Sequence, residues 1–145
     1  MEKIKLDNFF NEYAGRDFPE YESLSKNACS NIIQSILEKF TLTDVTDGLS
    51  MVKAIDTLGI PCEVASYVDE TFNLNALLKA CGIEAADFVY INWHRYDKID
   101  RLTRNDLTRH FYDLWYPEVD DIDIFDDSIN WILSIRHDGY IKMLR

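Results

Sequence analysis

The sequence has few cysteines and no cysteine motif. Among 145 residues there are three, Cys29, Cys62 and Cys81, an odd number without any Cys-x-x-Cys spacing. A disulfide framework or a zinc site would need an even or closely spaced set. Cys29 and Cys81 sit among apolar residues in helical patterns, where a thiol acts as a small hydrophobic side chain. We therefore expect reduced cysteines and a cytoplasmic protein.

Long apolar runs and targeting signals are also lacking. No apolar run approaches the roughly 20 residues that cross a bilayer, and residues 1–6 are not followed by the apolar core of a secretory signal. The glycine patterns G-x-x-x-x-G-K and G-x-G-x-x-G are absent, as is the nucleophile motif G-x-S-x-G. The sequence thus predicts a soluble protein without a membrane span, and we expect no cofactor.

Basic residues are scarce relative to acidic ones. Fifteen Lys and Arg face 26 Asp and Glu, which gives a formal net charge of −11. Because phosphate contacts dominate binding to nucleic acid, and anionic lipid also repels an acidic protein, we expect neither as a partner. A basic protein partner, or solubility alone, fits this charge. The hydrophobic content of 47% argues against disorder, and the length favours a single domain over residues 1–145.

Helical periodicity dominates the first half of the chain and strand character the last third. Apolar spacing predicts helices over 3–14, 23–40, 48–58, 71–81 and 103–115. Residues 64–68 suggest a connector or a brief strand, 87–93 an inner strand covered on both faces, and 94–101 a loop or short turn. Residues 129–135 alternate as a strand, and Asp138-Gly139 predicts a hairpin with a type I′ turn. The expected class is α+β, with helices on one face of a small antiparallel sheet that ends in a C-terminal β-hairpin.

A run of acids precedes this hairpin. It comprises Glu118, Asp120, Asp121, Asp123, Asp126 and Asp127. Ile122 and Ile124 alternate with the acids, which predicts a strand with carboxylates outward and apolar side chains inward. A calcium loop would need an oxygen ligand, a glycine and a glutamate where the chain has Phe125, Asp126 and Ile132, so we expect no metal.

Two interpretations of the acidic run stay open. It could be a docking surface for a basic protein, because complementary charge speeds association and penalises wrong partners. It could instead be an acidic edge that only keeps the sheet monomeric, in a structural or regulatory module. In either case we expect some of the acids to be neutralised inside the fold by a basic set, namely Arg95, Lys98, Arg101, Arg104 and Arg109.

Catalysis by histidine is a further alternative. His94 follows the strand 87–93 and adjoins Tyr96, and Asp97 or Asp100 could assist it as an acid or base. His110 falls on the apolar face of its helix, and His137 adjoins the hairpin turn. No nucleophile motif accompanies His94, so the sequence favours a binding protein over a small enzyme.

Residues 114–144 resemble immunity proteins of bacterial polymorphic toxin and contact-dependent growth inhibition systems. The resemblance rests on Trp115-Tyr116-Pro117, Asp120-Asp121, Phe125-Asp126, Ser128, Trp131 and His137-Asp138-Gly139 followed by an apolar strand. It implies a cytoplasmic antidote that binds one cognate toxin domain, often a nuclease, and blocks its active site, with no catalytic residues of its own. The expected contact residues are Tyr116 as an aromatic anchor together with Glu118, Asp120, Asp121, Asp123, Asp126 and Asp127.

Overall fold

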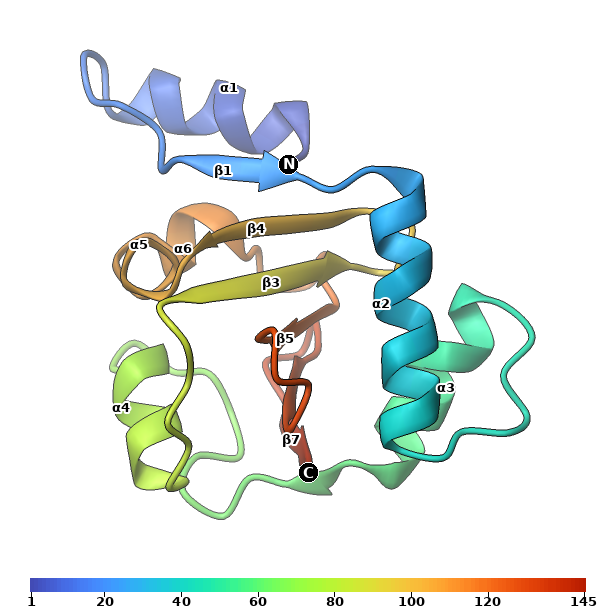
Figure 1. Ribbon diagram of the computed structural model, residues 1–145. Coiled ribbons are helices and arrows are strands. Elements are labelled where there is room, and N and C mark those ends of the chain that lie inside the picture. The colour runs from blue at the N-terminus through green and yellow to red at the C-terminus, as the bar shows by residue number, and fades with distance from the viewer.

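A seven-stranded antiparallel sheet runs through the centre of the computed structural model, which describes residues 1–145 (Figure 1). The strand order is β1-β4-β3-β5-β6-β7-β2. The strands are β1 (Tyr21–Ser23), β2 (Ile60–Pro61), β3 (Phe88–Trp93), β4 (Ile99–Thr103), β5 (Ile122–Phe125), β6 (Ile132–Ile135) and β7 (Ile141–Leu144). The helices are α1 (Lys3–Glu12), α2 (Lys26–Lys39), α3 (Gly48–Leu58), α4 (Leu74–Ala80), α5 (Arg104–Arg109) and α6 (Phe111–Leu114). The fold class is α+β, as the sequence predicts.

Each face of the sheet has its own hydrophobic cluster. Val89, Ile91, Ile122 and Ile124 point to the face that α4, α5 and α6 cover. Their strand neighbours point the other way, and Phe125 packs there with side chains of α2 and α3. In Figure 1 the two helical layers lie on opposite sides of the strands. The expectation of helices on one face is therefore wrong, because the central strands are apolar on both sides and each side needs cover.

Strand β3 is an inner strand, as its near-continuous apolar character predicts. It pairs with β4 on one side and β5 on the other. The expectation of a loop over residues 94–101 is only half right, since β4 begins at Ile99. The sequence does not predict the edge strands β1 and β2. Of the two alternatives for residues 64–68, the structure shows a connector with one isolated bridge, between Tyr67 and Tyr140. Such short edge strands carry too few residues for a periodic signal.

Local capping chemistry fixes the helix starts. Asp47 is the N-cap of α3, and its carboxylate accepts the Ser50 amide hydrogen at 2.7 Å while the Ser50 hydroxyl accepts the Asp47 amide hydrogen. Thr103 is the N-cap of α5, with the Asp106 amide donating to its hydroxyl at 3.0 Å. The expected helix over 103–115 is divided into α5 and α6 at His110, whose φ of −108° lies outside the helical range.

The C-terminal hairpin forms between β6 and β7, but its turn differs from the expected type I′. Only Gly139 has a positive φ, at +83°, and Asp138 does not. The Gly139 amide donates to the Arg136 carbonyl at 2.7 Å. A turn that is closed by this hydrogen bond, and whose last residue is a glycine in the left-handed region, gives the longer hairpin loop that ends in a bulge. Ile129 lies outside β6, with a φ of +50°, so the strand is shorter than the alternation over 129–135 predicts.

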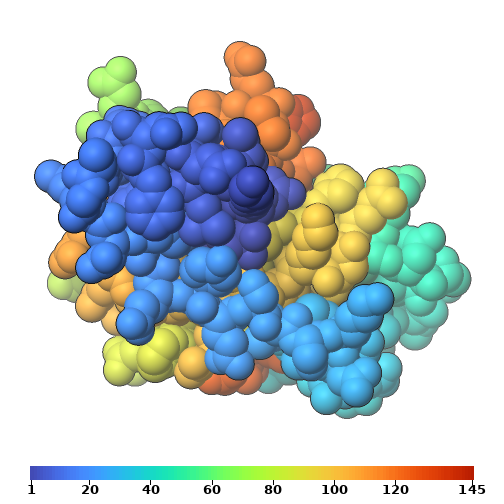
Figure 2. Space-filling view, turned by 90° about the horizontal axis from the view of Figure 1, so that it is seen from above, coloured from blue at the N-terminus to red at the C-terminus, as the bar shows by residue number.

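The N-terminal helix lies along one edge of the sheet. In the view from above, α1 (deep blue), the β3–β4 loop (yellow) and the segment after α6 (orange) meet on one face of the molecule (Figure 2). No helix combines the length and the apolar character that a bilayer crossing would require. These segments include His94 and the first residues of the acidic run, and the sequence predicts a candidate site at each of them.

Candidate functional site

Strand β5 divides the acidic run between two ends of the sheet. Glu118, Asp120 and Asp121 precede the strand, whereas Asp126 and Asp127 follow it. The last acid before the four-residue strand and the first acid after it are five residues apart, which is about 16 Å of extended chain at ~3.3 Å per residue. The acids therefore do not form one continuous surface. Each end of the strand has its own electrostatic environment.

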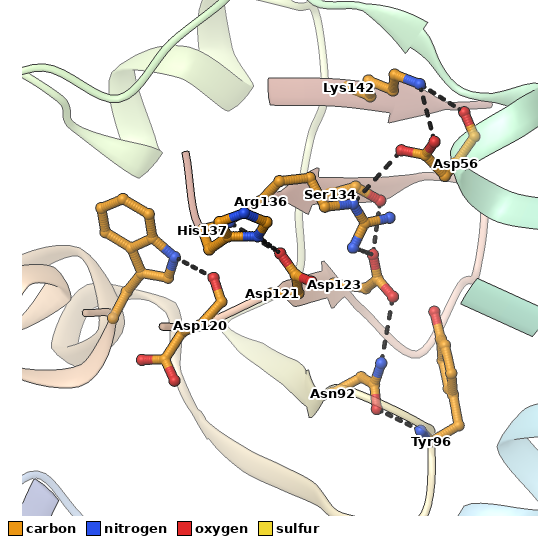
Figure 3. Close-up of polar contacts among 11 residues, drawn as sticks. Asp56, Asn92, Tyr96, Asp120, Asp121, Asp123, Ser134, Arg136, His137 and Lys142 are labelled. Atoms are coloured by element: carbon orange, nitrogen blue, oxygen red, sulfur yellow. Dashed lines mark hydrogen bonds and ion pairs between the residues drawn. The ribbon is translucent and has the colours of Figure 1, made fainter. Parts of the chain in front are cut away.

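Asp123 lies within β5 and is fully buried. Its two carboxylate oxygens accept hydrogen bonds from Ser134 Oγ at 2.6 Å and Asn92 Nδ2 at 3.2 Å, and Arg136 Nη1 lies 3.4 Å away (Figure 3). The strand register explains this set, because Asp123 pairs with Asn92 on β3 and with Ser134 on β6. The three side chains therefore emerge side by side on the face covered by α2 and α3. Asp123 is part of a buried polar network.

The network continues to the surface through Arg136. Its Nε lies 3.4 Å from the carboxylate of Asp56 in α3, and Lys142 Nζ approaches the other oxygen of Asp56 at 3.2 Å (Figure 3). At the other end, the Asn92 side-chain oxygen accepts the Tyr96 amide hydrogen at 2.6 Å. Burial raises the pKa of Tyr96 well above its ordinary 10, and the nearby Asp123 charge adds to the rise, so the phenol stays neutral. The network thus links the β3–β4 loop to the sheet and to α3.

Asp120 is also buried, against the N-terminal helix. Its carboxylate lies 2.5 Å from Lys5 Nζ, and it also accepts the Tyr116 amide hydrogen at 2.7 Å. Lys5 is itself fully buried, with its ammonium group 4.1 Å from the centre of the Tyr116 ring and 4.9 Å from that of Trp93. Aromatic faces stabilise such a cation. This pair fastens α1 to the turn that precedes β5.

Asp126 closes the far end of the strand. Its carboxylate accepts hydrogen bonds from the Trp131 indole at 3.1 Å, the Ala86 amide at 3.0 Å and the Ser128 hydroxyl at 2.5 Å. Burial alone would raise the pKa of Asp126, but these hydrogen bonds outweigh it and hold the pKa below the usual 3.8. The side chain therefore organises the turn between β5 and β6.

The expectation that the carboxylates point outward is therefore wrong for Asp120, Asp123 and Asp126. They are 9%, 0% and 2% exposed. For Asp123 the physical reason is that β5 is a central strand with helices over both faces, so alternation distinguishes two buried faces and not core from solvent. Asp120 and Asp126 lie outside the strand and are buried by their own partners, Lys5 and the β5–β6 turn. The basic set expected to neutralise the acids does not do so either. Lys5, Arg136 and His137 take that role, and Arg101 pairs instead with Glu22 at 3.9 Å.

The other expected contact residues reach solvent. Glu118 and Asp127 are exposed, and Tyr116 and Asp121 are half-buried. Asp127 accepts a hydrogen bond from the Tyr90 hydroxyl at the far end of β5. Tyr116, Glu118 and Asp121 lie together at the near end. Between them Val119, which sequence reasoning did not single out, is 72% exposed at the tip of the turn.

A surface hollow of about 470 Å³ lies beside this turn and includes His94 in its lining. Its other lining residues are Glu2, Trp93, Arg95, Asp97, Lys98, Val119, Asp120 and Asp121. The structure therefore brings the histidine of the enzyme hypothesis next to part of the acidic run. We call the acidic side chains of this region together with Val119 the turn surface, which comprises Glu2, Asp97, Glu118, Val119 and Asp121. His94, Arg95 and Lys98 are exposed beside it.

The β3–β4 loop that forms one wall of the hollow is strained. His94 and Tyr96 have positive φ values of 95° and 62°, which residues other than glycine seldom adopt. The Asn92 side chain holds the Tyr96 amide, and Gly48 approaches the loop so closely that a Cβ there would meet the Arg95 carbonyl oxygen at 2.1 Å. Strain of this kind persists only where the surroundings fix it, and it is common at functional sites.

Asp121 and His137 form a charge pair at the rim of the turn surface. The His137 imidazole Nδ1 lies 2.9 Å from Asp121 Oδ1, which also accepts the His137 amide hydrogen at 2.8 Å. Its hydrogen bond to Asp121 raises the pKa of His137 above 6.5. Burial raises the pKa of Asp121, but the hydrogen bonds from His137 outweigh it and bring the net pKa below 3.8. Each group thus favours the charged form of the other.

We expect the His137 imidazole to titrate above pH 6.5 in an NMR pH series. Replacing Asp121 with Asn should return the midpoint toward 6.5, and Asp138→Asn should shift it less, because Asp138 is a minor cause of the rise. The pair stabilises the fold at pH values between the pKa of Asp121 and the pKa of His137. The contribution of His137 is lost as pH rises through its raised pKa, and that of Asp121 as pH falls through its lowered pKa. An unchanged midpoint in Asp121→Asn would refute the pairing.

Comparison with known proteins adds no relative. No family model, curated protein or solved structure matches the chain. The resemblance of residues 114–144 to immunity proteins accordingly stays a prediction, and the case for function depends on the turn surface itself.

Proposed function

We propose that this protein is a cytoplasmic immunity protein that binds a cognate bacterial toxin domain and blocks its active site. The partner is a basic domain, of which a nuclease is the leading example. The observation that carries the proposal is the turn surface, where an apolar side chain projects between acids. Val119 is 72% exposed beside Glu118 and Asp121, and it lines the hollow next to His94. An apolar centre within a charged rim is the usual anatomy of a protein interface.

The charge of the molecule supports the same proposal. The net charge of −11 attracts a basic domain at long range and raises its association rate. Glu118 and the half-buried Asp121 would meet the basic cleft that holds phosphates in a nuclease, with Tyr116 behind them. The buried Asp120, Asp123 and Asp126 act differently from the sequence expectation. Asp120 and Asp123 hold the turn and β5 in place, and Asp126 holds the turn at the far end of the strand.

The direct test is protection of cells. The chain is expressed beside the toxin domain encoded next to it, and growth is measured together with complex formation on a sizing column. The proposal predicts survival, a stable complex and an affinity that falls as salt rises. Normal toxicity with no complex would exclude that toxin as the partner.

A substitution at the tip should separate binding from folding. We expect Val119→Arg to weaken binding by on the order of tenfold or more, because it places a like charge against a basic partner. Ile60→Arg is a matched control, since Ile60 is 65% exposed on β2 at the opposite edge of the sheet. Titration calorimetry with the toxin domain measures both affinities. Equal affinities for the two variants would place the interface elsewhere.

An enzyme that uses His94 is the second candidate. It is favoured by the hollow of about 470 Å³, in which His94 lies close to Asp97 and Lys98 on a strained loop. The two functions differ in the effect of His94→Ala. A binding protein keeps protecting cells with this variant, whereas an antidote that acts by catalysis loses protection while it still binds the toxin.

A further inference from the structure

Two of the three cysteines touch each other although 19 positions separate them in the sequence. Cys62 Sγ lies 3.4 Å from Cys81 Sγ. Both side chains belong to the hydrophobic cluster under α4, in which Cys62 is 4% exposed and Cys81 is partly buried. Cys29 lies in the other cluster, on the opposite face of the sheet. The odd number and wide spacing of the cysteines in the sequence give no sign of this pair, which forms only in the folded chain.

Backbone contacts hold both members of the pair in place. Cys62 directly follows β2, and its amide donates to the Ile141 carbonyl on β7 at 3.1 Å. Cys81 is the C-cap of α4, where its amide donates to the Leu77 carbonyl at 2.9 Å. Its own carbonyl accepts a hydrogen bond from Arg145, which follows β7. Both cysteines are thus anchored to neighbouring parts of one framework.

We propose that Cys62 and Cys81 are a site of disulfide formation that takes a small-molecule disulfide as its oxidant. The two sulfurs must close from 3.4 Å to about 2.05 Å for the bond to form. The bond would join the end of the edge strand β2 to the end of α4. This inference is independent of the proposed partner, since the pair lies away from the turn surface.

The chemistry balances in two exchange steps. The Cys81 thiolate, the more exposed of the two, attacks one sulfur of oxidised glutathione and releases a glutathione thiolate. Cys62 then loses its proton to solvent and attacks Cys81 Sγ, which releases the second glutathione as thiolate. The two protein thiols are oxidised to one disulfide, and the glutathione disulfide is reduced to two thiols that take up the two protons.

The rate should depend on pH, because only the thiolate attacks. Burial raises the pKa of Cys81, and the Arg145 guanidinium opposes this only in part. The reactive fraction at neutral pH is therefore smaller than for an ordinary exposed thiol. Below the raised pKa, oxidation should accelerate by about tenfold per pH unit. The pair is thus slow to oxidise at neutral pH.

The experiment treats the full chain with oxidised glutathione at mildly alkaline pH, then blocks the remaining thiols with N-ethylmaleimide. Mass spectrometry after trypsin should find peptide 54–79, which holds Cys62, joined to peptide 80–95, which holds Cys81. Peptide 27–39 should carry the maleimide on Cys29. The closed loop should raise the thermal unfolding midpoint by on the order of 5 °C or more, reversibly on adding dithiothreitol.

Three variants make the test specific. Cys81→Ser and Cys62→Ala should abolish the midpoint shift, and Cys29→Ala should keep it. Peptide mapping of the unaltered chain decides the matter even where a variant folds poorly. Maleimide on both Cys62 and Cys81 after oxidation, a stable glutathione adduct on Cys81 alone, or a disulfide between two chains would each overturn the proposal.

Discussion

Replacing Asp123 with Ala should destabilise the protein by about 3 kcal/mol or more, because it leaves the buried Asn92 and Ser134 and the partly buried Arg136 without their shared acceptor. Arg136 keeps Asp56 at 3.4 Å, and its side chain is only 13% exposed, so water cannot replace the lost carboxylate fully. The whole free energy of unfolding of a single domain is about 5–15 kcal/mol. The variant should therefore unfold at a much lower urea concentration.

The matched control for this substitution is Asp127→Asn. Asp127 is exposed, and an amide oxygen there can still accept from the Tyr90 hydroxyl. We expect it to change stability by no more than about 0.5 kcal/mol. Urea unfolding followed by tryptophan fluorescence measures both variants. If Asp123→Ala were as stable as Asp127→Asn, the buried network would have no net role in stability.

Replacing Lys5 with Met should lower the free energy of unfolding by about 3–5 kcal/mol, because it leaves the carboxylate of Asp120 buried without its cation. The Lys5 side chain is 1% exposed and that of Asp120 is 10% exposed, so solvent screens this pair weakly. Methionine fills a similar volume against Tyr116 and Trp93. The loss therefore reports the stranded charge more than a cavity.

The double variant Lys5→Met with Asp120→Asn should recover more than half of that loss. Asparagine is neutral and can still accept the Tyr116 amide hydrogen, so the buried charge disappears. Lys3→Met on the same helix is the control, since the Lys3 side chain is 88% exposed. The free energy of unfolding from urea titrations measures all three. A double variant no more stable than Lys5→Met would mean that packing, and not charge, holds α1.

The sequence alone predicts those helices, strands and turns whose signals lie within a few neighbouring residues. The capped helix over 48–58, the inner strand near 88–93 and the hairpin at Gly139 are all present, because caps, apolar runs and turn residues act within a few positions. It was insufficient where tertiary contacts decide. Nothing local indicates that β5 lies between β3 and β6, and this position is what turns Asp123 inward.

The candidate site follows the same division. The sequence placed Tyr116, Glu118 and Asp121 correctly near one another, but the partners of the acids come from far along the chain. Lys5 and Asp120 are 115 positions apart, and Asp56 and Lys142 are 86 apart. Lys5 gave one overlooked signal, because it lies four residues before Phe9 and therefore shares a helix face with this apolar side chain. A charge in such a position predicts a buried partner.

The strand order also has a consequence for biosynthesis. The five central strands come from residues 88–144, whereas the N-terminal half supplies only the two edge strands and half of the helices. A nascent chain therefore exposes the apolar sides of α2 and α3 on the ribosome before the surface that covers them has been translated. Such intermediates attract chaperones and aggregate readily. The central sheet can therefore form only after the C-terminal half has been translated, and α2 and α3 gain their cover at that stage.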